Sequence, residues 1–243
     1  MFRLLKIGAF VLSLAVFGVL TTNCGTDHSK VRFVHASSDA GSIDVAVDGK
    51  TVATDLAFGD VSPSSDYLTV TAGTRKVEVR PTGTTNDLIN SNVSLGSGKN
   101  YSVVASGLAN PPPGTIAAIV LTDDNTAPTS GNVKLRIVHV SPSVTPLPGA
   151  TIPGPVDVYV VAPGTDITGM SPTIPGLAYT QASAYQNIAA GSTEVIVTRT
   201  TDQNPIVDQT YDLASGQNRT LVLLDNGAVP NPVTTLLQLS DLN

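Results

Sequence analysis

Apolar and polar residues alternate along several short stretches of the chain, a period of two that is typical of half-buried β-strands. In residues 43–47 apolar side chains occupy every second position, and Asp48-Gly49 follows as a two-residue hairpin turn. Residues 76–80 alternate charged residues with valines, which predicts a strand with one solvent-facing side. We expect further strands over residues 101–105 and 116–122. No helical period competes with this pattern beyond residue 30.

This pattern occurs twice. The stretch VRFVHAS at residues 31–37 recurs as LRIVHVS at residues 135–141. The offset between the copies is 104 residues at His35 and His139, and it rises to 118 by Tyr185, after which it stays constant to the end of the repeat. A constant offset over such a length indicates an internal duplication, in which each copy is one structural unit.

Each copy is expected to contain about seven short strands, which predicts an all-β protein with two tandem immunoglobulin-like antiparallel β-sandwich domains. The sandwiches are expected at residues 31–126 and 133–243, with a linker at residues 127–132. The second copy is longer chiefly in Pro142–Pro155, which predicts a loop between its first and second strands. Such loops tolerate insertions and often carry binding, so this loop is the first candidate for a binding surface.

The amino terminus has the pattern of a secretory signal. Arg3 and Lys6 precede an uncharged, mostly apolar run from Ile7 to Leu20. A membrane-spanning helix needs about 20 apolar residues. The run is shorter than that, so residues 1–23 are predicted to be a cleaved signal peptide.

Cys24 is the only cysteine in the chain and stands directly after this signal. Its place resembles the lipobox cysteine of bacterial lipoproteins, although Thr21 and Asn23 replace the usual leucine and small residue. The resemblance implies that Cys24 is lipidated, that residues 24–30 are a tether, and that the membrane is a partner through the lipid anchor. Gly25 in place of an aspartate favours the outer membrane. The alternative is an ordinary signal peptide followed by an unmodified cysteine.

Four short motifs occur in both copies: Arg-x-Val-His-x-Ser at 32–37 and 136–141, Ile/Val-Asp-Val at 43–45 and 156–158, Leu-Ala-aromatic at 56–58 and 177–179, and Ala-Gly at 72–73 and 190–191. Together they resemble the bacterial domain of unknown function 4397. The family often has Ser-Pro-Asp after the histidine, whereas the two copies read Ser37-Ser38-Asp39 and Ser141-Pro142-Ser143. The resemblance covers nearly all of the chain after the tether; it implies secreted or surface-attached tandem modules and carries no activity or cofactor.

The charge of the chain argues against one class of partner. The formal net charge is -6, only 13% of the residues are charged, and no run of basic residues occurs. Binding to a nucleic acid backbone depends on clustered lysine and arginine side chains that neutralise phosphates. Nucleic acid is therefore excluded as an expected partner.

His35 and His139 occupy equivalent places in the repeat, with Asp44 and Asp157 downstream at equivalent places of their own. A metal site or an acid-base pair needs several such groups to converge. Both histidines lie on the apolar face of their predicted strand, so we interpret them as bonding backbone groups at the end of the sandwich. Acidic residues such as Asp123 are likewise interpreted as turn formers rather than calcium ligands. The sequence predicts no catalytic residue, metal or cofactor.

Tyr159 and Tyr179 are the two tyrosines expected to present surface rings, which could stack on a sugar; the remaining tyrosines lie in or beside strands and are expected in the core. We therefore expect a membrane-anchored cell-envelope lipoprotein that acts as a non-enzymatic structural or protein-interaction module. The alternative is a cell-envelope carbohydrate-binding protein. An enzyme is a more distant alternative, because it would need His35 and Asp39 or Asp44 in one cleft.

Overall fold

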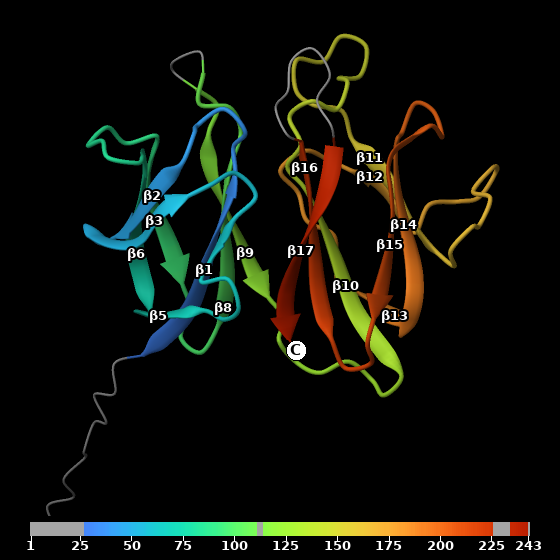
Figure 1. Cartoon of the computed structure of the whole chain (residues 1–243), viewed down its shortest axis with the longest axis horizontal. Coiled ribbons are helices and arrows are strands. Elements are labelled where there is room, and N and C mark those ends of the chain that lie inside the picture. Colours follow the sequence, from blue (N-terminus) through green and yellow to red (C-terminus); the bar gives the residue numbers. More distant parts are fainter. Residues whose placement is uncertain (1–26, 111–113, 226–233, 243) are drawn as a thin grey trace, which may run out of the picture.

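The computed structural model describes residues 27–110, 114–225 and 234–242 (Figure 1). Within these residues every regular element is a β-strand. No helix long and apolar enough to span a membrane is found in the described part of the chain. The predicted signal peptide, Cys24 and the start of the predicted tether lie outside the described residues.

The first domain contains two sheets that face each other. One sheet has the order β4-β1-β8-β9, with β5 also paired to β1, and the other has the order β3-β2-β6-β7. The strands are β1 (His28–Ala36), β2 (Ile43–Val47), β3 (Lys50–Leu56), β4 (Val61–Ser62), β5 (Leu68–Thr71), β6 (Gly73–Pro81), β7 (Ile89–Leu95), β8 (Asn100–Ser106) and β9 (Ala117–Asp123).

The second domain repeats this topology. Its sheets have the orders β13-β10-β16-β17 and β12-β11-β14-β15. The division between the domains therefore lies between β9 and β10. The strands are β10 (Asn132–His139), β11 (Val156–Val161), β12 (Ile174–Leu177), β13 (Gln186–Ala189), β14 (Gly191–Arg199), β15 (Pro205–Leu213), β16 (Asn218–Asp225) and β17 (Thr234–Leu242).

The strand register confirms the pattern seen in the sequence. Ile43, Val45 and Val47 are buried in the core, and the turn that follows has the left-handed backbone that such hairpins require, with φ of 50° at Asp48 and 77° at Gly49. The prediction of an all-β protein with two sandwiches is confirmed. Each domain also contains one parallel pair, β1 with β8 and β10 with β16, which an antiparallel sandwich would not contain.

These parallel strands are buried on both faces, and this explains their nearly continuous apolar sequences. In β1, Val31, Phe33 and His35 face the core of the first domain, as the sequence predicted. The alternate residues Val34 and Ala36 belong to a separate cluster that they form with residues of the second domain.

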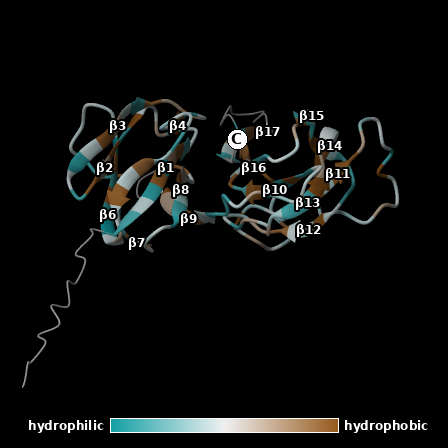
Figure 2. Ribbon diagram, turned by 90° about the horizontal axis from the view of Figure 1, so that it is seen from below, coloured by the Kyte–Doolittle hydropathy of each residue, from teal (hydrophilic) through white to brown (hydrophobic). Residues whose placement is uncertain are grey.

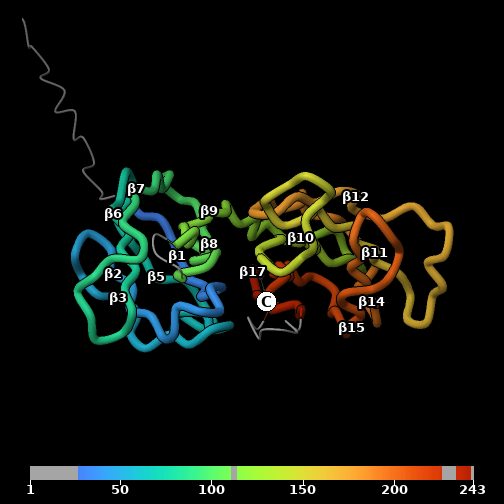
Figure 3. The backbone as a smooth tube through the Cα atoms, turned by 90° about the horizontal axis from the view of Figure 1, so that it is seen from above, coloured from blue at the N-terminus to red at the C-terminus, as the bar shows by residue number. Residues whose placement is uncertain are grey.

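The four sheets stack as four layers, with the two domains side by side (Figures 1 and 3). Hydrophobic residues lie on strands of both domains (Figure 2). Three apolar clusters fill the spaces between layers, one inside each domain and one between the domains. The cluster between the domains contains Val34, Ala36, Val104 and Leu121 from the first domain and Val138, Val140, Val222, Leu224 and Leu239 from the second.

Candidate functional site

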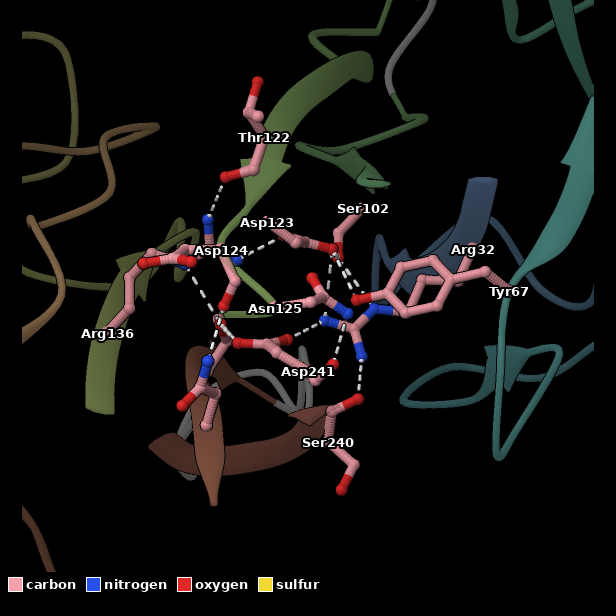
Figure 4. Close-up of polar contacts among 12 residues, drawn as sticks. Arg32, Tyr67, Ser102, Thr122, Asp123, Asp124, Asn125, Arg136, Ser240 and Asp241 are labelled. Atoms are coloured by element: carbon pink, nitrogen blue, oxygen red, sulfur yellow. Dashed lines mark hydrogen bonds and ion pairs between the residues drawn. The ribbon is translucent and has the colours of Figure 1, made fainter. Parts of the chain in front are cut away.

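Four charged side chains are buried at the lower end of the domain junction, where Figure 4 shows them converging. Arg32 comes from β1 and Arg136 from the equivalent place in β10, while Asp123 and Asp241 stand at or near the ends of β9 and β17. The side chains of both aspartates are 0% exposed, and those of Arg32 and Arg136 are 3% and 4% exposed. We call these four residues the ionic cluster.

Each arginine of the ionic cluster reaches into the opposite domain. Arg136 Nη2 contacts Asp123 Oδ1 at 2.5 Å, and Arg32 Nη2 makes the reciprocal ion pair with Asp241. Arg136 Nη1 donates to the Thr122 carbonyl at 2.9 Å, and Arg32 Nη1 donates to the Ser240 carbonyl at 2.7 Å. Each contact that the first domain makes with the second is therefore matched by an equivalent contact in the opposite direction. This is the arrangement found at a two-fold interface between identical subunits.

A ring of hydroxyl groups surrounds the aspartates of the ionic cluster. Ser102 Oγ donates to Asp123 at 2.6 Å and accepts from Arg32 Nε at 2.7 Å. Tyr67 Oη donates to Asp123 at 2.9 Å, and the Arg32 guanidinium lies over the Tyr67 ring, 4.9 Å from its centroid. Thr220 and Tyr185 repeat these contacts around Asp241, with hydrogen bonds of 2.6 and 2.8 Å.

The electrostatics of this site stabilise a neutral, fully bonded cluster. Burial, followed by the charge of Asp123, raises the pKa of Tyr67 far above its usual range, so this phenol stays protonated and donates. Burial alone would lower the pKa of Arg136, but Asp123 and its other neighbours raise it. Two buried cations and two buried anions each have hydrogen-bonding partners of opposite charge, which is the condition under which buried charges are tolerated. The site therefore joins the domains.

Asp124 and Asn125, which follow β9, also bond residues of the second domain. Asp124 Oδ2 pairs with Lys134 Nζ at 2.6 Å. Burial would raise the pKa of the Asp124 carboxyl, but the hydrogen bonds from Lys134 and Thr126 lower it to about 2. Asn125 Nδ2 donates to the Asp241 carbonyl. Asp123, the aspartate interpreted above as a turn former, is instead a buried partner of two arginines.

Two clefts open beside the ionic cluster, and most of the residues that line them have polar side chains. One has a volume of about 430 Å³ and the other of about 550 Å³. The first is lined by Lys30, Ser65, Asp66, Tyr67, Asn100, Asn125, Ser240 and Asp241. The second is lined by Gly98, Lys99, Asn100, Thr122, Asp123, Asp124, Asn125, Thr126 and Tyr185.

The two repeat histidines lie at the opposite end of the sandwiches from these clefts and bond backbone groups, as the sequence predicted. His35 Nε2 is 2.7 Å from the Gly41 carbonyl, and His35 Nδ1 accepts from the Ser37 amide at 3.3 Å. His139 Nε2 is 3.0 Å from the Gly154 carbonyl. Burial is the main cause that lowers the pKa of both imidazoles, so both are held neutral.

The two repeat aspartates hold neighbouring turns. Asp44 accepts from the Asp55 amide at 2.9 Å and from Thr82 Oγ1 at 3.0 Å, and the Asp55 bond is the main cause that lowers the pKa of Asp44. Asp157 Oδ1 accepts from the Gly176 amide at 2.8 Å. These aspartates therefore stabilise the loops around the outer sheets.

The expectation that Tyr159 presents a surface ring is wrong. Tyr159 does point to the outer face of its sheet, as the strand alternation implies, but it is only 2% exposed. The loop between β11 and β12 folds over that face, so that Ile167 packs on Tyr159, and Gln203 Nε2 donates to its hydroxyl at 3.1 Å. Tyr179 is half-buried and stands edge-on to His139, with the ring centroids 5.7 Å apart.

Sequence reasoning missed the tyrosines that do border a cleft, Tyr67 and Tyr185. The signal was present, because both occupy equivalent places in the repeat, as do Asp123 and Asp241. Nothing in the pattern of either copy alone says that these residues meet across a domain junction.

A tandem β-sandwich with a reciprocal junction is the class of protein that the fold and site define. The sequence profile of the domain of unknown function (DUF4397) matches residues 29–148 and 149–242, so the chain belongs to this family. The profile divides the chain inside the β10–β11 loop, whereas the sheets place β10 in the second domain.

Two solved structures illustrate the weaker structural similarity to other proteins. A carbohydrate-binding module (family CBM26) of Eubacterium rectale Amy13K, solved with maltoheptaose, is 9% identical, with 86% of this chain and 95% of that chain covered and a TM-score of 0.27. A candidate cell adhesion protein from Bacteroides uniformis is 11% identical, with 90% and 98% covered and a TM-score of 0.25. No curated protein matches the chain in sequence.

Proposed function

We propose that this protein is a lipid-anchored component of the bacterial cell envelope that acts as a non-enzymatic structural or protein-interaction module. Cys24 follows the apolar signal run and stands four positions before His28, the first residue of β1. Each buried methylene of an attached lipid contributes about 0.8 kcal/mol, so two or three acyl chains would hold the protein firmly. So short a tether would hold the lower end of the first domain close to the bilayer, with the outer membrane as the proposed location.

This anchor would fix which end of the protein faces a partner. The strands β1, β8, β10 and β16 all begin at the lower end in Figure 1, where the described part of the proposed tether, residues 27–30, also lies. The loop between β10 and β11 stands at the opposite end (Figure 1). An anchored protein would therefore present this loop away from the membrane.

The observation that carries the interaction role is the surface of this loop. Residues 140–155 contain no charged side chain, and Leu147 and Ile152 are 38% and 64% exposed. The loop base is closed by the Gly154 amide, which donates to the Val144 carbonyl at 3.1 Å. A side chain at Gly154 would place its Cβ 2.3 Å from the Thr145 carbonyl, so this base allows only glycine. A fixed base with exposed apolar residues is suited to docking on another protein.

The non-enzymatic part of the proposal is supported by how the candidate acid-base groups are used. The Asp39 carboxylate accepts from the amides of Ala109 and Asn110 at 2.7 and 2.9 Å. His35 and Asp44 bond separate backbone groups, as described above, and no hydrogen bond joins His35 to either aspartate among the described residues. An acid-base mechanism needs these groups within hydrogen-bond reach of one another or of a shared substrate.

A carbohydrate-binding role is the second candidate. Tyr159, one of the two tyrosines expected to stack on a sugar, is buried and does not support this role. The two clefts at the domain junction, lined mostly by residues with polar side chains, favour it instead.

The first test of the envelope role compares the wild-type chain, expressed in bacteria with its own signal, with Cys24→Ala. We expect the wild type to fractionate with membranes and to carry a lipid mass increment, and the variant to lose both. Intact-mass spectrometry and membrane fractionation measure the two outcomes. A wild-type protein that is soluble and unmodified after signal cleavage would overturn the anchoring half of the proposal.

A further inference from the structure

The two clefts beside the ionic cluster share two pairs of positions that are equivalent in the internal repeat. Each cleft is lined by a tyrosine of one domain that bonds the ionic cluster and by a residue of the last strand of the other domain. These residues are Tyr67 and Ser240 in the first cleft, and Tyr185 and Thr122 in the second. Tyr67 and Tyr185, like Thr122 and Ser240, are separated by the constant offset of 118 residues. Both clefts therefore include residues of both domains, although Tyr185 is the only residue of the second domain that lines the second cleft.

The side chains that line these clefts define the chemistry of a ligand. Residues with hydroxyl or amide side chains are the most numerous, each cleft has one aromatic ring, and each has one lysine and two aspartates. Side-chain amides both donate and accept hydrogen bonds, as the hydroxyl groups of a sugar do. An aromatic ring adds an apolar surface for the carbon face of a sugar ring. A phosphate-rich ligand would need more unpaired cations than these clefts supply.

Asn100 and Asn125 connect the two clefts, because both residues line both of them. Both asparagines are partly exposed as whole residues, and Asn100 begins β8 at the lower end of the first domain. The Asn125 amide is committed to the junction, because its Nδ2 donates to the Asp241 carbonyl and its Oδ1 is buried. A ligand with several hydroxyl-rich units in a row could contact one cleft, the shared asparagines and the second cleft. Occupying two linked sites with one ligand increases its overall affinity without any new type of contact.

We propose that the paired clefts at the domain junction bind a neutral oligosaccharide, with Asn100 at the centre of the site and Tyr67 and Tyr185 at its two sides. This proposal rests on the second function proposed above and assigns it a site. The clefts lie at the same end of the first domain as the start of β1, so the natural ligand is a polysaccharide of the envelope surface close to the anchor.

The test titrates chitohexaose, maltohexaose and cellohexaose into the full mature chain by isothermal titration calorimetry. We expect at least one hexasaccharide to bind, and Asn100→Ala to weaken it by about tenfold or more, since each buried polar partner left unpaired costs roughly that factor. Asn92→Ala, at an exposed asparagine on β7 in the outer sheet, is the matched control and should change the affinity less than twofold.

Two further variants keep the test independent of how Asn100→Ala folds. Ser65→Trp and Thr122→Trp replace exposed side chains and fill the first and second cleft respectively. Each variant should lower the affinity for the hexasaccharide and leave the thermal unfolding midpoint close to that of the wild type. Binding that survives all three variants would place the sugar elsewhere and overturn this site, but not the carbohydrate-binding function. Binding of inorganic phosphate but of no hexasaccharide, or of no probe at all, would overturn both.

Discussion

At the scale of single residues, His35 and His139 show how a titratable group serves the fold. The His35 imidazole bonds the Gly41 carbonyl and stands edge-on to Phe58. The His139 imidazole bonds the Gly154 carbonyl and stands edge-on to Tyr179. Burial lowers the pKa of both histidines, which means that the folded state prefers the neutral form. The far end of each sandwich is therefore stabilised only while its histidine is uncharged.

This preference predicts a pH dependence of stability. A histidine with a lowered folded-state pKa contributes fully above its unfolded value of about 6.5, and the contribution is lost as the pH falls below that value toward the folded pKa. We expect the free energy of unfolding to fall between about pH 7 and pH 5. The double variant His35→Gln/His139→Gln should be less stable at pH 7.5 and should show a flatter slope, measured by urea unfolding at each pH.

The aspartates give the control for this measurement. Asp44 and Asp124 have lowered pKa values, so their stabilising contributions are lost only below about pH 4, outside the histidine range. An equal slope between pH 7 and 5 in the wild type and the double variant would contradict the role assigned to the histidines.

Residue roles could be predicted where the environment is local. The place of His35 on the apolar face of a strand could be predicted from Phe33 and Val31, two and four positions before it. The role of Arg32 could not, because its partners Asp241 and Ser240 lie more than two hundred positions away in the chain. Local alternation marks Arg32 as an outward residue, and only the second domain turns that outward face into a buried one.

At the scale of elements, the strands could be predicted and the covering loops could not. The alternation in residues 43–47 and 76–80 fixed the inward face of β2 and β6 correctly. The same alternation placed Tyr159 on the outer face of β11, and its burial depends on Ile167 from a loop that carries no periodic signal. The parallel pairing of β1 with β8 also escaped prediction. A nearly continuous apolar run indicates a strand buried on both faces, but it does not say which distant strand is its partner.

The loop between β10 and β11 carries the prediction at this scale. Replacing residues 146–152 with a short Gly/Ser segment removes Leu147 and Ile152 but keeps Val144, which is buried, and Gly154, which closes the base. We expect the thermal unfolding midpoint to change little, because the removed tip contributes no residue to the core. Crosslinking of the anchored protein to its neighbours in intact cells should decrease.

The control for the loop variant is Met170→Ser, which removes a similarly exposed apolar side chain from the β11–β12 region. It should leave the crosslinking pattern unchanged. Crosslinking that is equal in the loop variant and the wild type would exclude this loop as the interaction surface, whatever its effect on stability.

At the scale of the whole molecule, the duplication creates more than two linked domains. The apolar cluster between the domains and the ionic cluster below it give each domain a partner for its inner sheet. The chain between β9 and β10 is held to the second domain, since Asn218 Nδ2 donates to the carbonyls of Asp124 and Thr126 at 2.6 and 2.8 Å. The repeat in the sequence predicted two units, but identical motifs contain no information about how the units pack on each other.

This junction predicts that the two domains unfold as one cooperative unit. Asp241→Asn leaves the buried arginines with one negative charge fewer, and breaking such a buried pair typically costs about 3–5 kcal/mol. We expect the wild type to unfold in one calorimetric transition. The free energy of unfolding of the variant should be lower, and its unfolding should separate into two transitions, because the substitution weakens the junction and not either core. Asp212→Asn, at an exposed aspartate on β15, is the matched control and should leave the single transition in place. Two independent transitions in the wild type would show that the junction does not couple the domains.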